Sequence, residues 1–256
     1  MTDGGVRFSV DGPVARVVLD RPEVRNAQTP ATWRALAEFG ASLPAEVRVV
    51  VVSGEGPSFS AGLDRRLIMG EPIDGEPPLL SLGTKAQAEI HQEIAGFQAG
   101  FCWLRDPSFV SIAAVQGHAV GAGFQLALAC DLRVITPDAK FSMREPALGL
   151  VPDLGGTHPL VELIGFSRAL EICATTRWVE ADEALRWGLA NIVVPAEELA
   201  GTVSDLSAAL LAPLAGAVRE TKALLIQAQR RSYDEQLQAE REAQARRLAE
   251  LTGSIS

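Results

Sequence analysis

Two short, mainly apolar runs constrain the fold of this chain most strongly. Residues 48–53 include four consecutive valines, and residues 110–115 form a second run of similar length. A run of this length without polar alternation is typical of a strand buried on both faces, as in a parallel sheet covered by helices. The sequence therefore predicts an α/β fold with a buried sheet.

The segments around these runs supply further strands and helices. Residues 6–10 and 14–19 have strand character and are joined by the turn Asp11-Gly12-Pro13, which predicts a hairpin. Thr29 followed by Pro30 is typical of a helix start. The order strand, strand, helix favours a spiral α/β arrangement over a regular alternation of one strand and one helix.

The remaining expectations concern the middle and the end of the chain. Residues 71–83 are rich in proline and glycine and predict a mobile loop. We expect helices at about 84–105 and 121–130, a strand at 132–135, and mostly helix from residue 159 apart from a short strand at 190–194.

A charged segment at the end of the chain, residues 233–251, carries only sparse apolar positions. Such a helix is either a solvated tail or docks a narrow apolar stripe on another subunit, and we favour docking. The domain division expected is a core of residues 1–195 followed by a C-terminal helical region of residues 196–256.

Composition narrows the classes of partner. Acidic residues outnumber basic ones by 32 to 23, giving a formal net charge of -9, so neither nucleic acid nor an anionic membrane is expected to bind. No apolar stretch approaches the ~18 residues that span a bilayer. We expect a cytoplasmic protein whose three cysteines, Cys102, Cys130 and Cys173, are reduced and buried.

Two glycine-containing bends are candidates for a site built from backbone N–H groups. They are Phe59–Asp64 and Gly117–Gly123, and the second opens a helix. Glycine permits close approach of a ligand, and a helix N-terminus favours negative charge. Together the bends could form an oxyanion hole, although glycines before a helix are also used for tight packing alone. Neither segment matches the glycine motif of dinucleotide-binding proteins or the nucleophile motif of serine hydrolases.

Four ordered blocks show that the chain resembles the enoyl-CoA hydratase/isomerase (crotonase) superfamily over nearly its whole length. The blocks are residues 20–27, 59–64, 111–131 and 141–157. The resemblance implies a crotonase-like spiral of ββα repeats with a C-terminal helical trimerisation region, and a homotrimer or a dimer of trimers. It also implies an acyl-CoA substrate and no cofactor beyond the coenzyme A that the substrate carries.

The resemblance further assigns roles to residues of these blocks. It implies that the N–H groups of Leu63 and Ala122 hold the thioester oxygen. It also implies a coenzyme A path with phosphate-binding arginines, made up of Arg25, Ala27, Ala61, Gly62, Leu63, Asp64, Arg65, Arg66 and Gly121.

The reaction depends on the acid/base residues, and here the chain departs from the family pattern. Hydratases of the family use two glutamates, and the aligned positions are Gln125 and Glu145. A single carboxylate favours double-bond isomerisation with Glu145 as acid/base. Asp153 is a possible second proton carrier or a turn residue, and Glu145 could instead pair with Arg144.

Two alternatives to the isomerase stay open from the sequence. One is an enoyl-CoA hydratase that uses Glu145 and Asp153, and the other is an acyl-CoA-binding protein without catalysis. The three histidines are far apart along the chain, so no metal site is expected.

Overall fold

A mixed sheet forms the centre of the computed structural model, which describes residues 2–73 and 75–253. Its strand order is β1-β2-β3-β4-β5-β7-β10. The strands are β1 (Thr2–Asp3), β2 (Val6–Asp11), β3 (Val14–Leu19), β4 (Val49–Gly54), β5 (Val110–Val115), β7 (Leu132–Ile135) and β10 (Ile192–Val193). The predicted hairpin is confirmed as antiparallel β2 and β3, and pairing from β3 to β10 is parallel.

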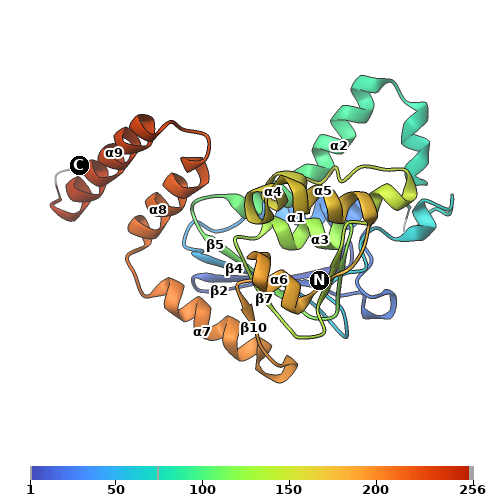
Figure 1. The fold of residues 1–256 in the computed structure, drawn as a ribbon, viewed down its shortest axis with the longest axis horizontal. Coiled ribbons are helices and arrows are strands. Elements are labelled where there is room, and N and C mark those ends of the chain that lie inside the picture. The colour runs from blue at the N-terminus through green and yellow to red at the C-terminus, as the bar shows by residue number, and fades with distance from the viewer. Residues whose placement is uncertain (1, 74, 254–256) are drawn as a thin grey trace.

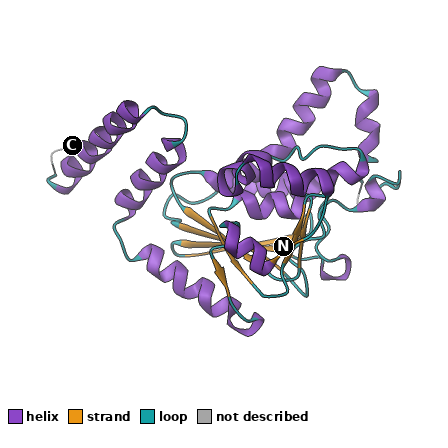
Figure 2. Cartoon of the chain, viewed as in Figure 1, coloured by secondary structure: helices purple, strands orange, loops and turns teal. Residues whose placement is uncertain are grey.

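Both faces of the central strands are covered, as the apolar runs predict. In β4, Val50 and Val52 belong to the main core, whereas Val49 and Val51 pack in a second core against the helix α7 (Leu199–Leu211). Every residue of β5 is buried. Because successive side chains of a strand point to opposite faces, a continuous valine run is needed where helices lie on both sides. Figure 2 shows these helical layers around the sheet.

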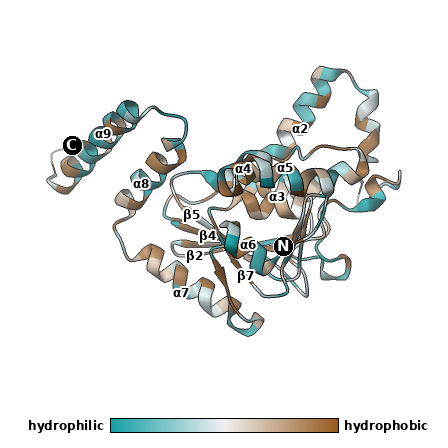
Figure 3. Cartoon of the chain, in the orientation of Figure 1, coloured by the Kyte–Doolittle hydropathy of each residue, from teal (hydrophilic) through white to brown (hydrophobic). Residues whose placement is uncertain are grey.

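The helices that complete the fold follow the predicted segments. The first begins at the Thr29 cap with Pro30 as its first residue, as predicted. The α-helices other than α7 are α1 (Pro30–Ala41), α2 (Gln87–Cys102), α3 (Ala122–Ala129), α4 (Thr157–Ile164), α5 (Phe166–Thr175), α6 (Ala181–Trp187), α8 (Ala215–Ala228) and α9 (Tyr233–Leu251). In Figure 3, α3 has mostly hydrophobic colours, and all of its residues are buried.

A small second sheet was not anticipated from the sequence. It has the order β6-β8-β9, with β6 (His118–Val120), β8 (Lys140–Ser142) and β9 (Val179–Glu180). These strands have two or three residues each, which is too short for a readable period of alternation. The sheet matters because β6 leads directly into α3.

Two further expectations need correction. Leu79–Thr84, predicted as part of a loop, is a 3-10 helix, because Leu79 and Leu82 pack against the core and Ser81 caps the carbonyl of Pro78. Asp74, within the same predicted loop, lies outside the described residues. All three cysteines are free thiols, but Cys102 is exposed and Cys173 is only partly buried, because the periodicity of α2 and α5 does not by itself fix which face meets the core.

The two last helices extend from the body as a C-terminal arm, which we define as α8 and α9 (Figure 1). Lys222 of α8 anchors it, with its ammonium group donating to the carbonyls of Asp106 and Phe109 and to the Asp131 carboxylate, each at 2.7 Å. The Arg48 guanidinium holds the carbonyls of Leu211 and Pro213 just before the arm.

Membrane-spanning potential is limited in the described residues. No single helix there has both the length and the hydropathy to cross a bilayer, and one pair, Ala196–Leu211 with Ala215–Ala228, meets the criterion jointly by length and composition while bent by 102°.

Candidate active site

The two bends predicted from the sequence lie side by side. Ser60 donates its N–H to the carbonyl of His118 at 2.8 Å, and Val120 donates to the carbonyl of Ser60 at 3.0 Å. Gly62 packs so closely that a methyl group on its Cα would lie 2.3 Å from the Val120 oxygen and 3.4 Å from the Ala122 nitrogen. With φ at +81°, only glycine fits this position without strain.

One N–H group in each bend is left available. In the first, Gly62 donates to the Ser60 hydroxyl and Asp64 to the carbonyl of Gln28, whereas the Leu63 N–H makes no hydrogen bond within residues 2–73 and 75–253. Ala122 is the first residue of α3, so its N–H has no partner inside the helix. Leu63 and Ala122 both line a cavity of about 830 Å³.

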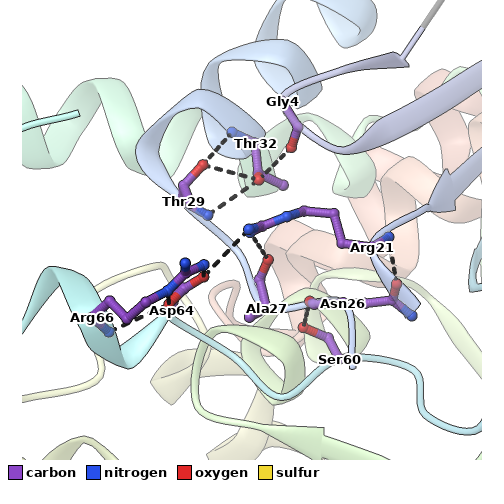
Figure 4. Close-up of polar contacts among 9 residues, drawn as sticks. All are labelled: Gly4, Arg21, Asn26, Ala27, Thr29, Thr32, Ser60, Asp64 and Arg66. Atoms are coloured by element: carbon purple, nitrogen blue, oxygen red, sulfur yellow. Dashed lines mark hydrogen bonds and ion pairs between the residues drawn. The ribbon is translucent and has the colours of Figure 1, made fainter. Parts of the chain in front are cut away.

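A buried polar network fixes the first bend (Figure 4). The Ser60 hydroxyl donates to the carbonyl of Asn26 at 2.7 Å and accepts from the Gln28 amide at 3.0 Å. Asn26 itself has φ +55° and holds the carbonyls of Glu55 and Ser58. Sequence reasoning assigned no role to these side chains, because short polar residues in a loop carry no periodic signal.

The residues predicted to line the coenzyme A path fall into two groups. Ala61, Gly62, Leu63, Arg65 and Gly121 line the cavity. The others are not among the cavity-lining residues.

The second group includes Asp64, whose carboxylate pairs with Arg66. Asp64 is 5% exposed and receives hydrogen bonds from Arg66, which keeps the pKa of its carboxyl below the usual range. Arg21 donates to Asp64 and to the carbonyl of Ala27 (Figure 4). Arg25 is exposed with φ +53°, and its carbonyl accepts from Ala61. Asp64 therefore orders Arg66 and Arg21 beside the first bend.

Glu145 is the carboxylate beside the second bend. Its Oε1 accepts a hydrogen bond of 2.6 Å from Gln125 and lies 3.2 Å from where a methyl group on Gly121 would sit. Its Oε2 is buried and has no hydrogen-bond partner among the described residues. Burial raises the pKa of Glu145, and the nearby charge of Asp153 raises it further. A carboxyl in this state suits proton transfer.

Gln125 lies behind Glu145 and does not line the cavity. It is fully buried in α3, and its carbonyl oxygen accepts from the N–H groups of Leu154 and Gly156 at 2.9 and 3.2 Å. The amide thus holds Glu145 on one side and the turn after Asp153 on the other. Both ends of the amide are therefore occupied by protein groups, the nitrogen by Glu145 and the oxygen by Leu154 and Gly156.

Asp153 lines the same cavity as Glu145, and burial raises the pKa of its carboxyl. Arg144 does not form the ion pair with Glu145 that the sequence left open. Its guanidinium lies over the ring of Trp178, 4.9 Å from the ring centroid. Two carboxyl groups and two backbone N–H groups therefore border one cavity.

No group of three or more histidine, cysteine, aspartate or glutamate side chains in the described part of the chain is arranged to hold a metal ion. His118 instead contacts the Ser58 hydroxyl at 3.3 Å and packs its edge against Trp178.

Paired N–H donors beside a buried carboxyl define a class of enzyme that stabilises an oxyanion while moving a proton. The family model for enoyl-CoA hydratase/isomerase matches residues 10–254, and the chain belongs to this family. Carnitinyl-CoA dehydratase of Salmonella enteritidis PT4 is 37% identical over 210 residues, covering 80% of this chain and 74% of that protein.

Solved structures show the same relationship. A candidate enoyl-CoA hydratase from Thermobifida fusca YX in complex with CoA is 50% identical with a TM-score of 0.93, covering 98% of this chain and 95% of that one. A candidate enoyl-CoA hydratase from Thermobifida fusca YX in complex with acetoacetyl-CoA is 51% identical with a TM-score of 0.93, covering 96% of each chain. An enoyl-CoA hydratase subunit from Geobacillus kaustophilus HTA426 is 29% identical, with a TM-score of 0.83 over 97% of this chain and 91% of that one. The α/β spiral of the crotonase family is thereby confirmed.

Proposed function

We propose that this enzyme isomerises the double bond of an enoyl-CoA through a thioester enolate, with Glu145 as the acid/base. The observation that carries the proposal is the state of Glu145, whose side chain lines the cavity. One carboxyl oxygen accepts a hydrogen bond from the Gln125 amide, and the other is buried without a hydrogen-bond partner among the described residues. No second carboxylate comes from α3, since glutamine occupies that position.

The reaction follows from these groups. The Glu145 carboxylate takes a proton from C2 of a 3-enoyl-CoA, and the electron pair moves into the thioester carbonyl to give an enolate. The N–H groups of Leu63 and Ala122 hold the enolate oxygen, where one such donor contributes about 3 to 4 kcal/mol. The protonated Glu145 then returns the proton to C4, and the double bond ends between C2 and C3.

A hydratase or dehydratase is the second candidate. It is favoured by the similarity to a carnitinyl-CoA dehydratase and by Asp153, whose charge acts on Glu145 from the same cavity. In this reaction Asp153 would hold the water that adds to C3.

Separate incubation with 3-enoyl-CoA and 2-enoyl-CoA tests the choice. An isomerase converts the first into the second without net uptake of water, and mass spectrometry of the products reads this directly. A 3-hydroxyacyl-CoA formed from the 2-enoyl substrate at a comparable rate would reject the isomerase. Binding of both thioesters without turnover would support the non-catalytic alternative.

The C-terminal arm also belongs to the proposal. We infer that it mediates a homotrimer, as the family resemblance implies, because it carries large exposed apolar side chains on both helices. These are Leu225, Tyr233, Leu248 and Leu251.

A further inference from the structure

The walls of the active-site cavity are mainly apolar, but they include a cationic side chain that has no role in the proposed proton transfer. Leucine, isoleucine, valine and aromatic side chains make up most of the lining. The charged lining residues are Arg65, Arg144, Glu145 and Asp153. Arg65 belongs to the first bend, where the coenzyme is expected, but Arg144 lies next to the acid/base residue.

The position of the Arg144 guanidinium is fixed by a stack of rings. It lies over Trp178 at 4.9 Å from the ring centroid. His118 meets the same indole edge-on, with ring centroids 5.5 Å apart, and is in turn held by the Ser58 hydroxyl. An arginine stacked in this way keeps its in-plane N–H groups free to donate.

Those N–H groups have no acidic partner within residues 2–73 and 75–253, where no ion pair or hydrogen bond joins the Arg144 side chain to another residue. Several other half-buried arginines have acidic partners, whereas Arg48 is held by backbone carbonyls. Arg177 is held by Glu171 and Glu183, and Arg21 contacts Asp64. A half-buried cation without a counter-ion is costly to keep beside apolar walls, and its charge is available to a ligand.

We propose that Arg144, stacked on Trp178, binds a carboxylate at the far end of the acyl chain, so that the preferred substrate is an enoyl-CoA with a terminal carboxylate. This inference rests on the proposed function and names its substrate class. A guanidinium matches a carboxylate with two parallel hydrogen bonds.

The test uses pairs of 3-enoyl-CoA thioesters of equal chain length, one ending in a carboxylate and one in a methyl group. For the native enzyme we expect a higher kcat/KM for the carboxylated member at the chain length that reaches Arg144. In Arg144→Gln this preference falls by roughly 10- to 100-fold, the magnitude of charge-assisted hydrogen bonds. Arg144→Lys keeps the positive charge but cannot donate two parallel hydrogen bonds, so its preference for the carboxylated thioester is intermediate.

Arg168→Gln is the matched control, since Arg168 also stacks on an indole, that of Trp187 at 5.1 Å, but does not line the cavity. It leaves the preference unchanged. Three results would overturn the inference: no preference in the native enzyme at any length, equal losses for both members in Arg144→Gln, or an equal loss of affinity for coenzyme A alone, which would assign the guanidinium to the coenzyme phosphates.

Calorimetric binding separates this inference from the proposed reaction. Saturated acyl-CoA thioesters with and without a terminal carboxylate bind without reacting. If no enoyl substrate turns over but the native protein binds the carboxylated thioester more tightly and Arg144→Gln does not, the isomerase proposal fails and the role of Arg144 stands. Equal affinities for the two thioesters reject the role of Arg144 whatever the reaction.

Discussion

Glu145 couples activity and stability at the scale of a single residue. Burial raises the pKa of this carboxyl in the folded protein above its value in the unfolded chain. Between those two values the folded state binds more protons, so stability falls as pH rises through that window. Above that window, the ionised buried carboxylate lowers the free energy of unfolding, although the reaction requires it.

Glu145→Gln should therefore lower kcat/KM by roughly 10²- to 10⁴-fold while raising stability at neutral pH. Urea unfolding measures the gain in stability. This gain disappears below the ordinary pKa of glutamate, where residue 145 is neutral in both the native protein and the variant. In the native enzyme, kcat/KM falls with decreasing pH at a value above that ordinary pKa. Glu46→Gln, at an exposed loop position, changes neither property, and unchanged activity in Glu145→Gln would reject the assignment.

Gln125→Glu tests the reason for a single acid/base. The substitution keeps an acceptor for Leu154 and Gly156 but replaces the amide donor by a second carboxyl at hydrogen-bond distance from Glu145. Two adjacent carboxyls share a proton, so one pKa rises further. We expect the acid limb of the pH profile to move upward and hydration of 2-enoyl-CoA to increase relative to isomerisation. An unaltered profile and product ratio would mean that Gln125 does not govern the choice.

At the scale of elements, the close contact between the two bends sets the oxyanion geometry. Gly62→Ala places a methyl group against the Val120 carbonyl and strains a residue at φ +81°. The bends must separate, so we expect kcat to fall by about 10²- to 10³-fold, as for loss of one donor. Gly201→Ala, in α7 with open space around it, keeps activity and gains a little stability. Wild-type kcat in Gly62→Ala would contradict the assigned site.

Lys222 joins the C-terminal arm to the body, and its loss should release the arm. Its side chain is 10% exposed, and Lys222→Met leaves two carbonyls and the Asp131 carboxylate without their cation. Breaking such a pair costs about 3 kcal/mol, measured as a lower urea midpoint together with faster proteolysis between α7 and α8. Arg219→Met, whose side chain on the same helix is 53% exposed, costs less than about 0.5 kcal/mol. Equal effects would place the anchor elsewhere.

At the scale of the whole molecule, the proposed trimer would cover the exposed apolar side chains of the arm. Leu225 and Leu251 are 68% and 63% exposed, and burying them against other copies would remove apolar surface from water. Light scattering should give the mass of three or six chains. Leu225→Asp with Leu251→Asp should reduce it, whereas Leu185→Asp, on α6 of the body, should not. A single-chain mass for the native protein would contradict the trimer.

The sequence by itself determined the buried sheet, the hairpin, the capped start of α1 and the two bends, because each depends on a local pattern: a valine run, a turn, a cap, or glycines before a helix. The motif resemblance then singled out Leu63, Ala122 and Glu145, which the fold places around one cavity.

Only the tertiary structure decided what each side chain meets. The amide of Gln125 points to Glu145 and the turn after Asp153 and not to the cavity, Asp64 pairs with arginines, and Arg144 stacks on Trp178 instead of pairing with Glu145. These contacts join residues far apart in the chain, and their geometry depends on the packing of whole elements, which no local pattern encodes. The short β6, β8 and β9 were missed for the same reason, since pairing partners and not their own sequences make them strands.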